Sequence, residues 1–450
     1  MPRAPSLRLA PLTPLTVILL LAGLHMLVFD RGLGGDGWAS FAALESLVED
    51  GDLYLENNLR GVDNGIVPTS SGHRIMQYPP GILLLDLPPF LAGREVDCLL
   101  PAGWLAHGFD LPPVGRVPRR VVLEVAAIVL TRNAATLLGL FFLAQALQRL
   151  GVGERRVAAA VALTFFGGPL LFYSLVGMTH APTFALASLL FFLLVRQREE
   201  GRIGLALAAG GVLGLATLVR YGAVGLLPAA LLGVPPSRPG GRDAARGVLA
   251  FGVGFILPLL LLPLYWHAGS GEWGPPGYGG TWHFTLASPW NVLLSPQHGL
   301  FLFHPALLLA ALGLVWMAGA ELARRAPGIG TVALLGFLGI AVLHGGWSEW
   351  ANPGGYGQRF LIDALPFLGL GFARVLAARP RWAWRGTLAL ATGFGYLLFF
   401  TAVAGLAPPP PPYPWPQRLA DYRSLLTHPP GPAEIWMGMK QASLLVRRIA

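Results

Sequence analysis

Three arginines lie at unusual places in the chain, next to long apolar runs. Arg132, Arg220 and Arg359 each lie at the end of a long apolar run, on the side that otherwise carries few basic residues. A charged side chain at such a place is costly and therefore marks a partner or a function. The planar guanidinium matches the oxygens of a phosphate, so a phosphate site is one interpretation. Snorkelling of the side chain to lipid headgroups is the other.

A carboxylate follows the first apolar run and heads a periodic segment. Asp36 comes after two glycines, and the apolar residues beyond it recur at helical spacing, with Glu45 and Glu49 off that face. These apolar residues are Trp38, Phe41, Leu44, Leu47 and Val48. The pattern predicts an amphipathic helix in the membrane interface that starts at Asp36 and stops at Gly51. Asp36 is therefore a candidate N-cap of that helix.

The composition indicates what surrounds these residues. Of the 450 residues, 54% are hydrophobic and 12% are charged, whereas soluble domains carry about 25% charged residues. A chain this apolar cannot cover its surface with polar groups in water, so lipid must surround much of it. The net charge of +9 does not indicate nucleic-acid binding, because the arginines form small clusters between apolar runs, as orientation charges do. The single cysteine, Cys98, excludes an intramolecular disulfide.

Apolar runs long enough to cross a membrane, or nearly so, recur along the chain. A spanning helix needs about 20 predominantly apolar residues. The runs are 11–29, 131–149, 157–175, 181–195, 203–220, 222–234, 247–267, 299–318, 329–345, 360–378 and 385–405. No small-x-small cleavage site follows the first run, so we expect it to be retained rather than removed as a signal peptide. The fold class predicted is all-α, a polytopic membrane protein with about eleven transmembrane helices.

The arginines between the runs predict which ends face the cytoplasm. If the amino end is cytoplasmic, the inner connections are the arginine-rich ones, near residues 149–156, 196–202, 238–246, 324–325 and 379–385. The outer connection 268–298 contains no Lys or Arg, which agrees with the positive-inside rule. The outer side then carries a first loop over 30–120 and a tail, 406–450, that opens with the prolines 408–412 as an extended spacer.

Within the first outer loop, a second apolar stretch from Tyr78 to Leu91 is broken by four prolines, so we expect it to be another interfacial helix. A first span, then a Gly-Asp pair heading one interfacial helix and Tyr-Pro-Pro-Gly leading the next, resembles the GT-C superfamily of glycosyltransferases. Bacterial relatives of the protein mannosyltransferases and of the lipid A aminoarabinose transferase are especially similar. The segment 46–53 is similar to theirs, and 357–366 resembles their Arg-Tyr-Leu-x-x-x-x-Pro segment. On this resemblance, residues 1–405 form one transmembrane domain.

The resemblance implies an enzyme of the bacterial inner membrane whose active site faces the extracytoplasmic side. It implies transfer of a sugar, with inversion in a single displacement, from a polyprenyl-phosphate donor to a glycan, lipid or protein acceptor. Such a reaction needs a carboxylate as general base and fixed cations for the leaving phosphate. The expected partners are therefore the lipid-linked donor, the acceptor and membrane lipids, without nucleic acid. No cofactor is assigned, and a divalent metal is left open.

The resemblance also suggests roles for particular residues. The catalytic candidates are Asp36, His180 and Glu349; the candidates for the donor phosphate are Arg220, Arg359 and Arg132; the candidates for acceptor or sugar contact are His73, Tyr78, Trp282 and His283. Two positions depart from the family. Gly37 stands where relatives usually have a second acid, and Thr179-His180 stands where many have another.

Other interpretations stay open at this point. A lipid or polysaccharide flippase or transporter would place ionisable groups at mid-membrane, whereas the span centres here are nearly free of charge. A non-catalytic scaffold of the same fold would explain Gly37. The tryptophans of 268–298 would also suit a membrane-interface belt with no role in binding.

Overall fold

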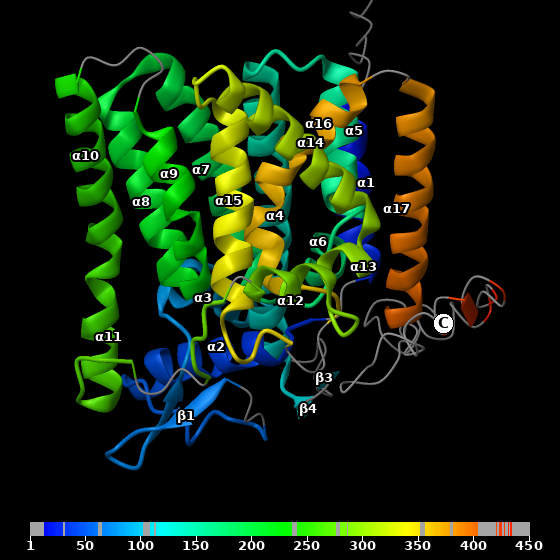
Figure 1. Cartoon of the computed structure of the whole chain (residues 1–450). Helices are drawn as coiled ribbons and strands as arrows, with labels where there is room; N and C mark the ends of the chain where they lie inside the picture. The colour runs from blue at the N-terminus through cyan, green and yellow to red at the C-terminus, as the bar shows by residue number, and fades with distance from the viewer. Residues whose placement is uncertain are drawn as a thin grey trace, which may run out of the picture.

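The structure is a computed structural model, and it shows a bundle of roughly parallel helices with α10 and α17 at its two edges (Figure 1). It describes residues 13–403 except 30–31, 62–64, 102–108, 112–113, 236–240, 276–279, 286, 352–355 and 379–380, and a few isolated residues of the tail. The proline run 408–412 of the tail lies outside the described residues.

The helices follow the apolar runs of the sequence. Those of the bundle are α1 (Pro14–Phe29), α4 (Arg119–Arg149), α5 (Glu154–Phe166), α6 (Leu170–Tyr173), α7 (His180–Glu200), α8 (Ile203–Val219), α9 (Leu227–Gly233), α10 (Gly241–Leu259), α11 (Leu261–Ser270), α13 (Leu300–Phe303), α14 (Pro305–Ala323), α15 (Ile329–Gly345), α16 (Leu365–Ala377) and α17 (Arg381–Val403). Two 3-10 helices, η2 (Tyr221–Leu226) and η3 (Arg359–Ala364), lead into α9 and α16.

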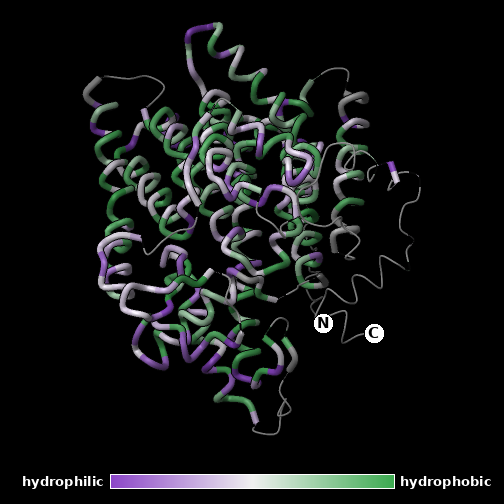
Figure 2. Tube along the Cα trace, turned by 60° about the horizontal axis from the view of Figure 1, so that its bottom comes forward, coloured by the Kyte–Doolittle hydropathy of each residue, from purple (hydrophilic) through white to green (hydrophobic). Residues whose placement is uncertain are grey.

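Several of these helices are long and apolar enough to cross a membrane. Within the described residues, five segments meet both conditions: 119–149, 180–200, 243–270, 305–323 and 359–377. Four further apolar helices, in 14–27, 203–219, 221–233 and 329–345, are shorter. The chain is therefore an integral membrane protein by length and composition, while the number eleven stays a prediction. Figure 2 shows the apolar residues concentrated along the bundle and the hydrophilic ones towards its ends and loops.

One end of the bundle, the lower end in Figure 1, carries most of the non-helical chain, and we call it the loop-rich end. It holds α2 (Gly35–Glu45), the π-helix η1 (Ser46–Asp50), α3 (Gly81–Leu99) and α12 (Ser288–Leu294). Two antiparallel hairpins join them: β1 (Ile66–Pro68) with β2 (Arg74–Met76), and β3 (Phe109–Leu111) with β4 (Gly115–Val117). This end is the first outer loop of the sequence prediction together with the 268–298 connection.

The first expected interfacial helix forms, but two details of the prediction are wrong. Its N-cap is Gly34, and Asp36 lies two residues further on, in the first turn of the helix. Glu45, expected off the buried face, is fully buried, because the helix is covered on both sides and Arg60 pairs with the carboxylate. The stop is as expected, since Gly51 ends η1 with φ of +74°, a conformation that favours glycine.

The second interfacial helix, α3, is longer than its apolar stretch and keeps Pro88 and Pro89 inside it. It packs so closely on α4 that a Cβ on Gly93 would lie 2.6 Å from the Cα of Glu124. Beneath the interfacial helices lies a hydrophobic core of its own, which includes Trp38, Phe41 and Phe90. The interfacial helices are thus firmly attached to the bundle.

At the opposite end of the bundle, the connections predicted to face inward lie together. Arg149 at the end of α4 pairs with Glu199 at the end of α7, with 3.0 Å between nitrogen and oxygen. Arg198 donates to the carbonyl of Pro327, just before α15, over 2.8 Å. The helices therefore alternate in direction as the arginine pattern predicts, while the side of the membrane that each end faces stays a prediction.

Candidate active site

The head of α2 packs directly on the turn of residues 176–178 that precedes α7. The backbone N–H of Gly34 donates to the carbonyl of Val176 over 2.7 Å. A Cβ on Gly37 would come within 2.6 Å of the Gly177 carbonyl oxygen. In this packing, residue 37 has no room for a side chain. The absence of a second acid at Gly37 therefore has a steric reason.

Asp36 lies beside a tyrosine and an arginine from distant parts of the chain. The Tyr78 hydroxyl donates to Oδ1 of Asp36 over 2.8 Å. One terminal nitrogen of Arg359 lies 3.9 Å from Oδ2. The Asp36 and Arg359 side chains are 10% and 15% exposed, so both stay within reach of a ligand. Residues 36, 78 and 359 were separate candidates in the sequence, and the structure brings them together.

The Tyr-Pro-Pro-Gly segment places Tyr78 at this point. Pro80 is the N-cap of α3, and a Cβ on Gly81 would lie 2.5 Å from the backbone of Leu218. The start of α3 thus sits against the end of α8, where Arg220 is the C-cap. Behind Tyr78 lies Gly65, where a Cβ would come 2.3 Å from the phenol ring. Close backbone contacts therefore fix the ring from two sides.

Arg220 has a buried partner that the sequence analysis did not find. Nη1 of Arg220 lies 3.4 Å from each oxygen of Asp363, which is fully buried in η3. The signal was present, because Asp363 is an acid within an apolar run, which by default suggests a functional partner. We call Asp36, Tyr78, Arg220, Arg359 and Asp363 the acid–arginine cluster.

Phe360 joins the two arginines of the cluster. The guanidinium carbons of Arg359 and Arg220 lie 5.4 Å and 5.9 Å from the centroid of its ring, distances at which an aromatic ring attracts a cation. His344 stacks on the same ring, with centroids 4.9 Å apart. Two cations thus gather around one aromatic side chain, and two carboxylates balance their charge. Such an arrangement suits an added phosphate, which arginine binds through paired hydrogen bonds.

Arg132 is more deeply buried than Arg220 and Arg359. Its side chain is 1% exposed and forms an ion pair with Asp86, which is equally buried. It also donates to the carbonyl of Gly177 and, over 3.1 Å, to the hydroxyl of Ser40. Snorkelling is therefore wrong for this residue, since the guanidinium is enclosed by α2, α3 and the turn before α7. These contacts join α2, α3 and the turn before α7 around one guanidinium. Its expected contact with the donor phosphate stays a prediction.

The structure does not join the other two catalytic candidates to Asp36 by any described contact. His180 is buried at the start of α7, and its ring stacks on Tyr173 with centroids 4.9 Å apart. Neither ring nitrogen finds a hydrogen-bond partner among the described residues. Glu349 is exposed in the turn after α15. In the described part of the chain, no three metal-ligating side chains gather at one place.

The candidates for acceptor or sugar contact, Tyr78 apart, lie on exposed loops. His73 stacks on Tyr54, with 3.8 Å between ring centroids, and lies 3.5 Å from Glu56. Trp282 is 45% exposed and stacks on Trp347, with centroids 6.2 Å apart. Its neighbour His283 is also exposed and contacts the Thr281 hydroxyl. Trp347 in turn meets the edge of Phe360, so ring contacts lead from Trp282 to the aromatic ring between the two arginines.

Comparison with known proteins decides the fold. No family model and no curated protein sequence matches the chain. The structure is similar to that of ArnT from Cupriavidus metallidurans bound to undecaprenyl phosphate, with a TM-score of 0.53 over 97% of this chain and 72% of that one. The chain has the GT-C fold. The two sequences are 15% identical, so the likeness shows the fold and not the reaction.

An archaeal enzyme with the GT-C fold is more distant. The apo oligosaccharyltransferase of Archaeoglobus fulgidus has a TM-score of 0.46 and 10% identity over 95% of this chain. The same enzyme, in complex with an inhibitory peptide and a dolichol-phosphate, gives a TM-score of 0.43 and 12% identity over 95% of this chain. This chain spans 64% and 55% of those chains, less than two thirds of their length.

Proposed function

We propose that this protein is a membrane glycosyltransferase that moves a sugar from a polyprenyl-phosphate donor to an acceptor on the loop-rich side. The observation that carries the proposal is the acid–arginine cluster, in which the carboxylate of Asp36 lies 3.9 Å from the guanidinium of Arg359. A general base and a cation for the leaving group are thus neighbours at one end of the bundle. Transfer to a hydroxyl requires both.

In the proposed step, an acceptor hydroxyl oxygen attacks the anomeric carbon of the donor sugar. The bond from that carbon to the phosphate oxygen breaks, and the electron pair leaves with the polyprenyl phosphate. Asp36 takes the proton of the hydroxyl, while Arg359 and Arg220 stabilise the charge that develops on the phosphate. One displacement inverts the configuration at the anomeric carbon. Tyr78 holds the Asp36 carboxylate in place through its hydroxyl.

The distances within the cluster support a role for the arginines in binding phosphate. The separations are 3.9 Å for Arg359 with Asp36 and 3.4 Å for Arg220 with Asp363, whereas close charge-assisted hydrogen bonds measure about 2.7–2.9 Å. A phosphate would accept hydrogen bonds from both guanidinium groups, since its oxygens match their planar geometry. ArnT, whose fold this chain shares, was crystallised with undecaprenyl phosphate, a ligand of the proposed kind.

The test is transfer from a panel of radiolabelled polyprenyl-phosphate sugars by the purified protein. We expect Asp36→Asn to lower the rate by at least roughly 100-fold, the usual contribution of a general base. The control is Asp243→Asn, because Asp243 is 69% exposed on α10. Transfer that survives Asp36→Asn would contradict the assignment of the base and direct attention to His180 or Glu349.

The arginines are tested by their affinity for the donor. Arg359→Gln and Arg220→Gln should each weaken the binding of undecaprenyl phosphate by roughly tenfold or more, as the loss of a charged hydrogen bond predicts. Arg246→Gln, at a side chain that is 67% exposed on α10, should leave it unchanged. A folded protein that neither transfers a sugar from any donor nor binds undecaprenyl phosphate would favour the interpretation as a non-catalytic scaffold. Movement of the lipid across the membrane without sugar transfer would favour a flippase.

A further inference from the structure

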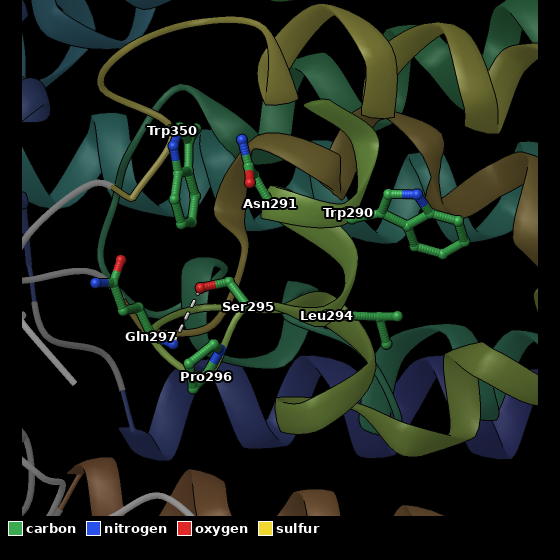
Figure 3. A pocket seen from close by; sticks show the side chains of 7 residues that line it. All are labelled: Trp290, Asn291, Leu294, Ser295, Pro296, Gln297 and Trp350. Carbon is green, nitrogen blue, oxygen red and sulfur yellow. Dashed lines mark hydrogen bonds between the residues drawn. The ribbon is translucent and has the colours of Figure 1, made fainter. Parts of the chain in front are cut away.

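A second site lies at the loop-rich end, apart from the acid–arginine cluster. Figure 3 shows a pocket between α12, the residues that follow it and Trp350. Its volume is about 420 Å³, within the range of about 300–1,000 Å³ that is usual for small-molecule sites. The residues that line it do not include any member of the acid–arginine cluster.

The side chains that line the pocket are uncharged. They include the indoles of Trp290 and Trp350, the carboxamides of Asn291 and Gln297 and the hydroxyl of Ser295. A phosphate would find no cation here, and an ammonium ion no carboxylate. Flat aromatic faces next to amide and hydroxyl groups suit a neutral ring that is apolar on its faces and carries hydroxyls on its rim. This is the chemistry of a saccharide.

Two contacts hold the polar groups of the pocket in place. The side-chain nitrogen of Asn291 reaches the carbonyl of Gly345 over 3.4 Å, so that its oxygen lies on the side of Ser295 (Figure 3). The Ser295 hydroxyl accepts the backbone N–H of Gln297 over 3.2 Å. A ligand hydroxyl can therefore donate to the Asn291 oxygen and exchange hydrogen bonds with the other groups.

One short turn separates the pocket from the acid–arginine cluster. Trp347 at its start meets the edge of Phe360, with centroids 5.3 Å apart. Trp350 at its end lines the pocket, and its carbonyl accepts the side chain of Gln358, the residue before Arg359, over 3.1 Å. Residues 347–350 therefore connect the surroundings of the two sites. A ring in the pocket is not the one that reacts beside Asp36.

We propose that the pocket binds a neutral sugar ring of the acceptor, beyond the hydroxyl that is glycosylated. The inference rests on the proposed function and deepens it, because it makes the acceptor a glycan or a glycolipid. Trp350 stacks on the ring, and Asn291, Ser295 and Gln297 bind its hydroxyls. The transferred sugar stays with its phosphate at the acid–arginine cluster.

The test measures binding of methyl glycosides of glucose, galactose, mannose and N-acetylglucosamine to the purified protein by saturation-transfer NMR. We expect at least one to bind. Trp350→Leu and, as an independent change, Gln297→Ala should each weaken that binding by roughly tenfold, the effect of about 1.4 kcal/mol. The matched control is Trp273→Leu, because Trp273 is 62% exposed at the same end and does not line the pocket.

A second measurement separates this inference from the proposed function. Trp350→Leu and Gln297→Ala should leave the affinity for undecaprenyl phosphate unchanged, whereas Arg359→Gln should weaken it. If no glycoside binds the parent protein, or if it binds the pocket variants equally well, the inference is overturned while transfer and its dependence on Asp36 stand. If the pocket variants lose affinity for undecaprenyl phosphate instead, the pocket takes the lipid and the inference is equally overturned.

Discussion

At the scale of single residues, the position of Tyr78 depends on a glycine outside the acid–arginine cluster. Gly65 has φ of +81°, and a Cβ there would lie 2.3 Å from the Tyr78 ring. Gly65→Ala should therefore displace the ring, break the hydrogen bond to Asp36 and lower the transfer rate. A hydrogen bond to a charged group contributes about 1.5–3 kcal/mol, which corresponds to a rate roughly 10- to 100-fold lower.

Gly72 in the turn between β1 and β2 supplies the control. Its φ is +87°, so alanine there meets the same backbone strain, but nothing lies within 4 Å of a Cβ on Gly72. The backbone strain should cost each variant about 1–2 kcal/mol of stability, and Gly65→Ala should lose more because its Cβ also clashes with the Tyr78 ring. Only Gly65→Ala should lose activity, to about the level of Tyr78→Phe. Equal activity of the two alanine variants would show that the Tyr78 hydroxyl does not assist Asp36.

Arg132 and Asp86 make a separate prediction about stability. Because both side chains are 1% exposed, removal of one partner leaves a buried charge, which costs about 3–5 kcal/mol. Arg132→Met should therefore strongly lower the unfolding temperature in detergent, and the double change Arg132→Met with Asp86→Leu should recover part of the loss. Arg149→Met on the same helix should change little, since Arg149 and Glu199 are each 41% exposed. A stable Arg132→Met with reduced affinity for undecaprenyl phosphate would support Arg132 as a phosphate ligand.

At the scale of the elements, one carboxylate joins two helices at the end opposite the active site. Glu321 near the end of α14 accepts the backbone N–H groups of Gly328, Gly330 and Thr331 over 2.8–2.9 Å. These belong to the start of α15, whose first N–H groups have no partner within the helix. Glu321→Ala should therefore lower the free energy of unfolding by about 1–2 kcal/mol.

The control for Glu321 is Glu154→Ala. Glu154 also lies in the first turn of a helix, α5, and it is exposed. Unfolding measured for both variants should show a clear loss for Glu321→Ala and little change for Glu154→Ala. Equal losses would mean that the bonds to the start of α15 add nothing beyond the favourable effect of an acid near any helix N-terminus.

The elements were largely predictable from the sequence, and their polar partners were not. Each apolar run of the prediction coincides with a helix or a pair of helices, because burial in lipid demands apolar side chains and internal backbone hydrogen bonds over the whole run. The pairs of Arg220 with Asp363 and Arg132 with Asp86 join residues 143 and 46 positions apart. No local periodicity specifies such a partner, so the sequence can mark a charged residue within an apolar run but not the residue with which it pairs.

The steric use of the glycines was equally hidden. The sequence suggested a missing acid at Gly37, whereas the structure shows a backbone carbonyl in the space that a side chain would need. A sequence pattern shows which side chains are present. It does not show where the absence of a side chain allows two backbone segments to pack closely. The interfacial helix was likewise expected to bury one face, but the hairpins and α3 cover it further, which is why Glu45 is enclosed with Arg60.

At the scale of the whole molecule, the two ends of the bundle differ in kind. The loop-rich end carries the acid–arginine cluster and the pocket, held by close backbone contacts between α2, α3, α8 and the turn before α7. The opposite end carries short connections with exposed arginines such as Arg202, whose side chain is 70% exposed. This asymmetry suits a protein that does its chemistry at one membrane surface and is oriented by charge at the other.

The orientation can be measured with the chain's own cysteine. Cys98 is the single cysteine of the sequence and is exposed near the end of α3, at the loop-rich end. If the arginine-rich end faces the cytoplasm, a membrane-impermeant maleimide added to intact cells should label Cys98. The variant that combines Cys98→Ser with Arg202→Cys should be labelled only after the membrane is permeabilised. The reverse labelling pattern would place the acid–arginine cluster on the cytoplasmic side. The acceptor would then have to be a cytoplasmic molecule, which would contradict the proposal of an enzyme that acts on the cell envelope.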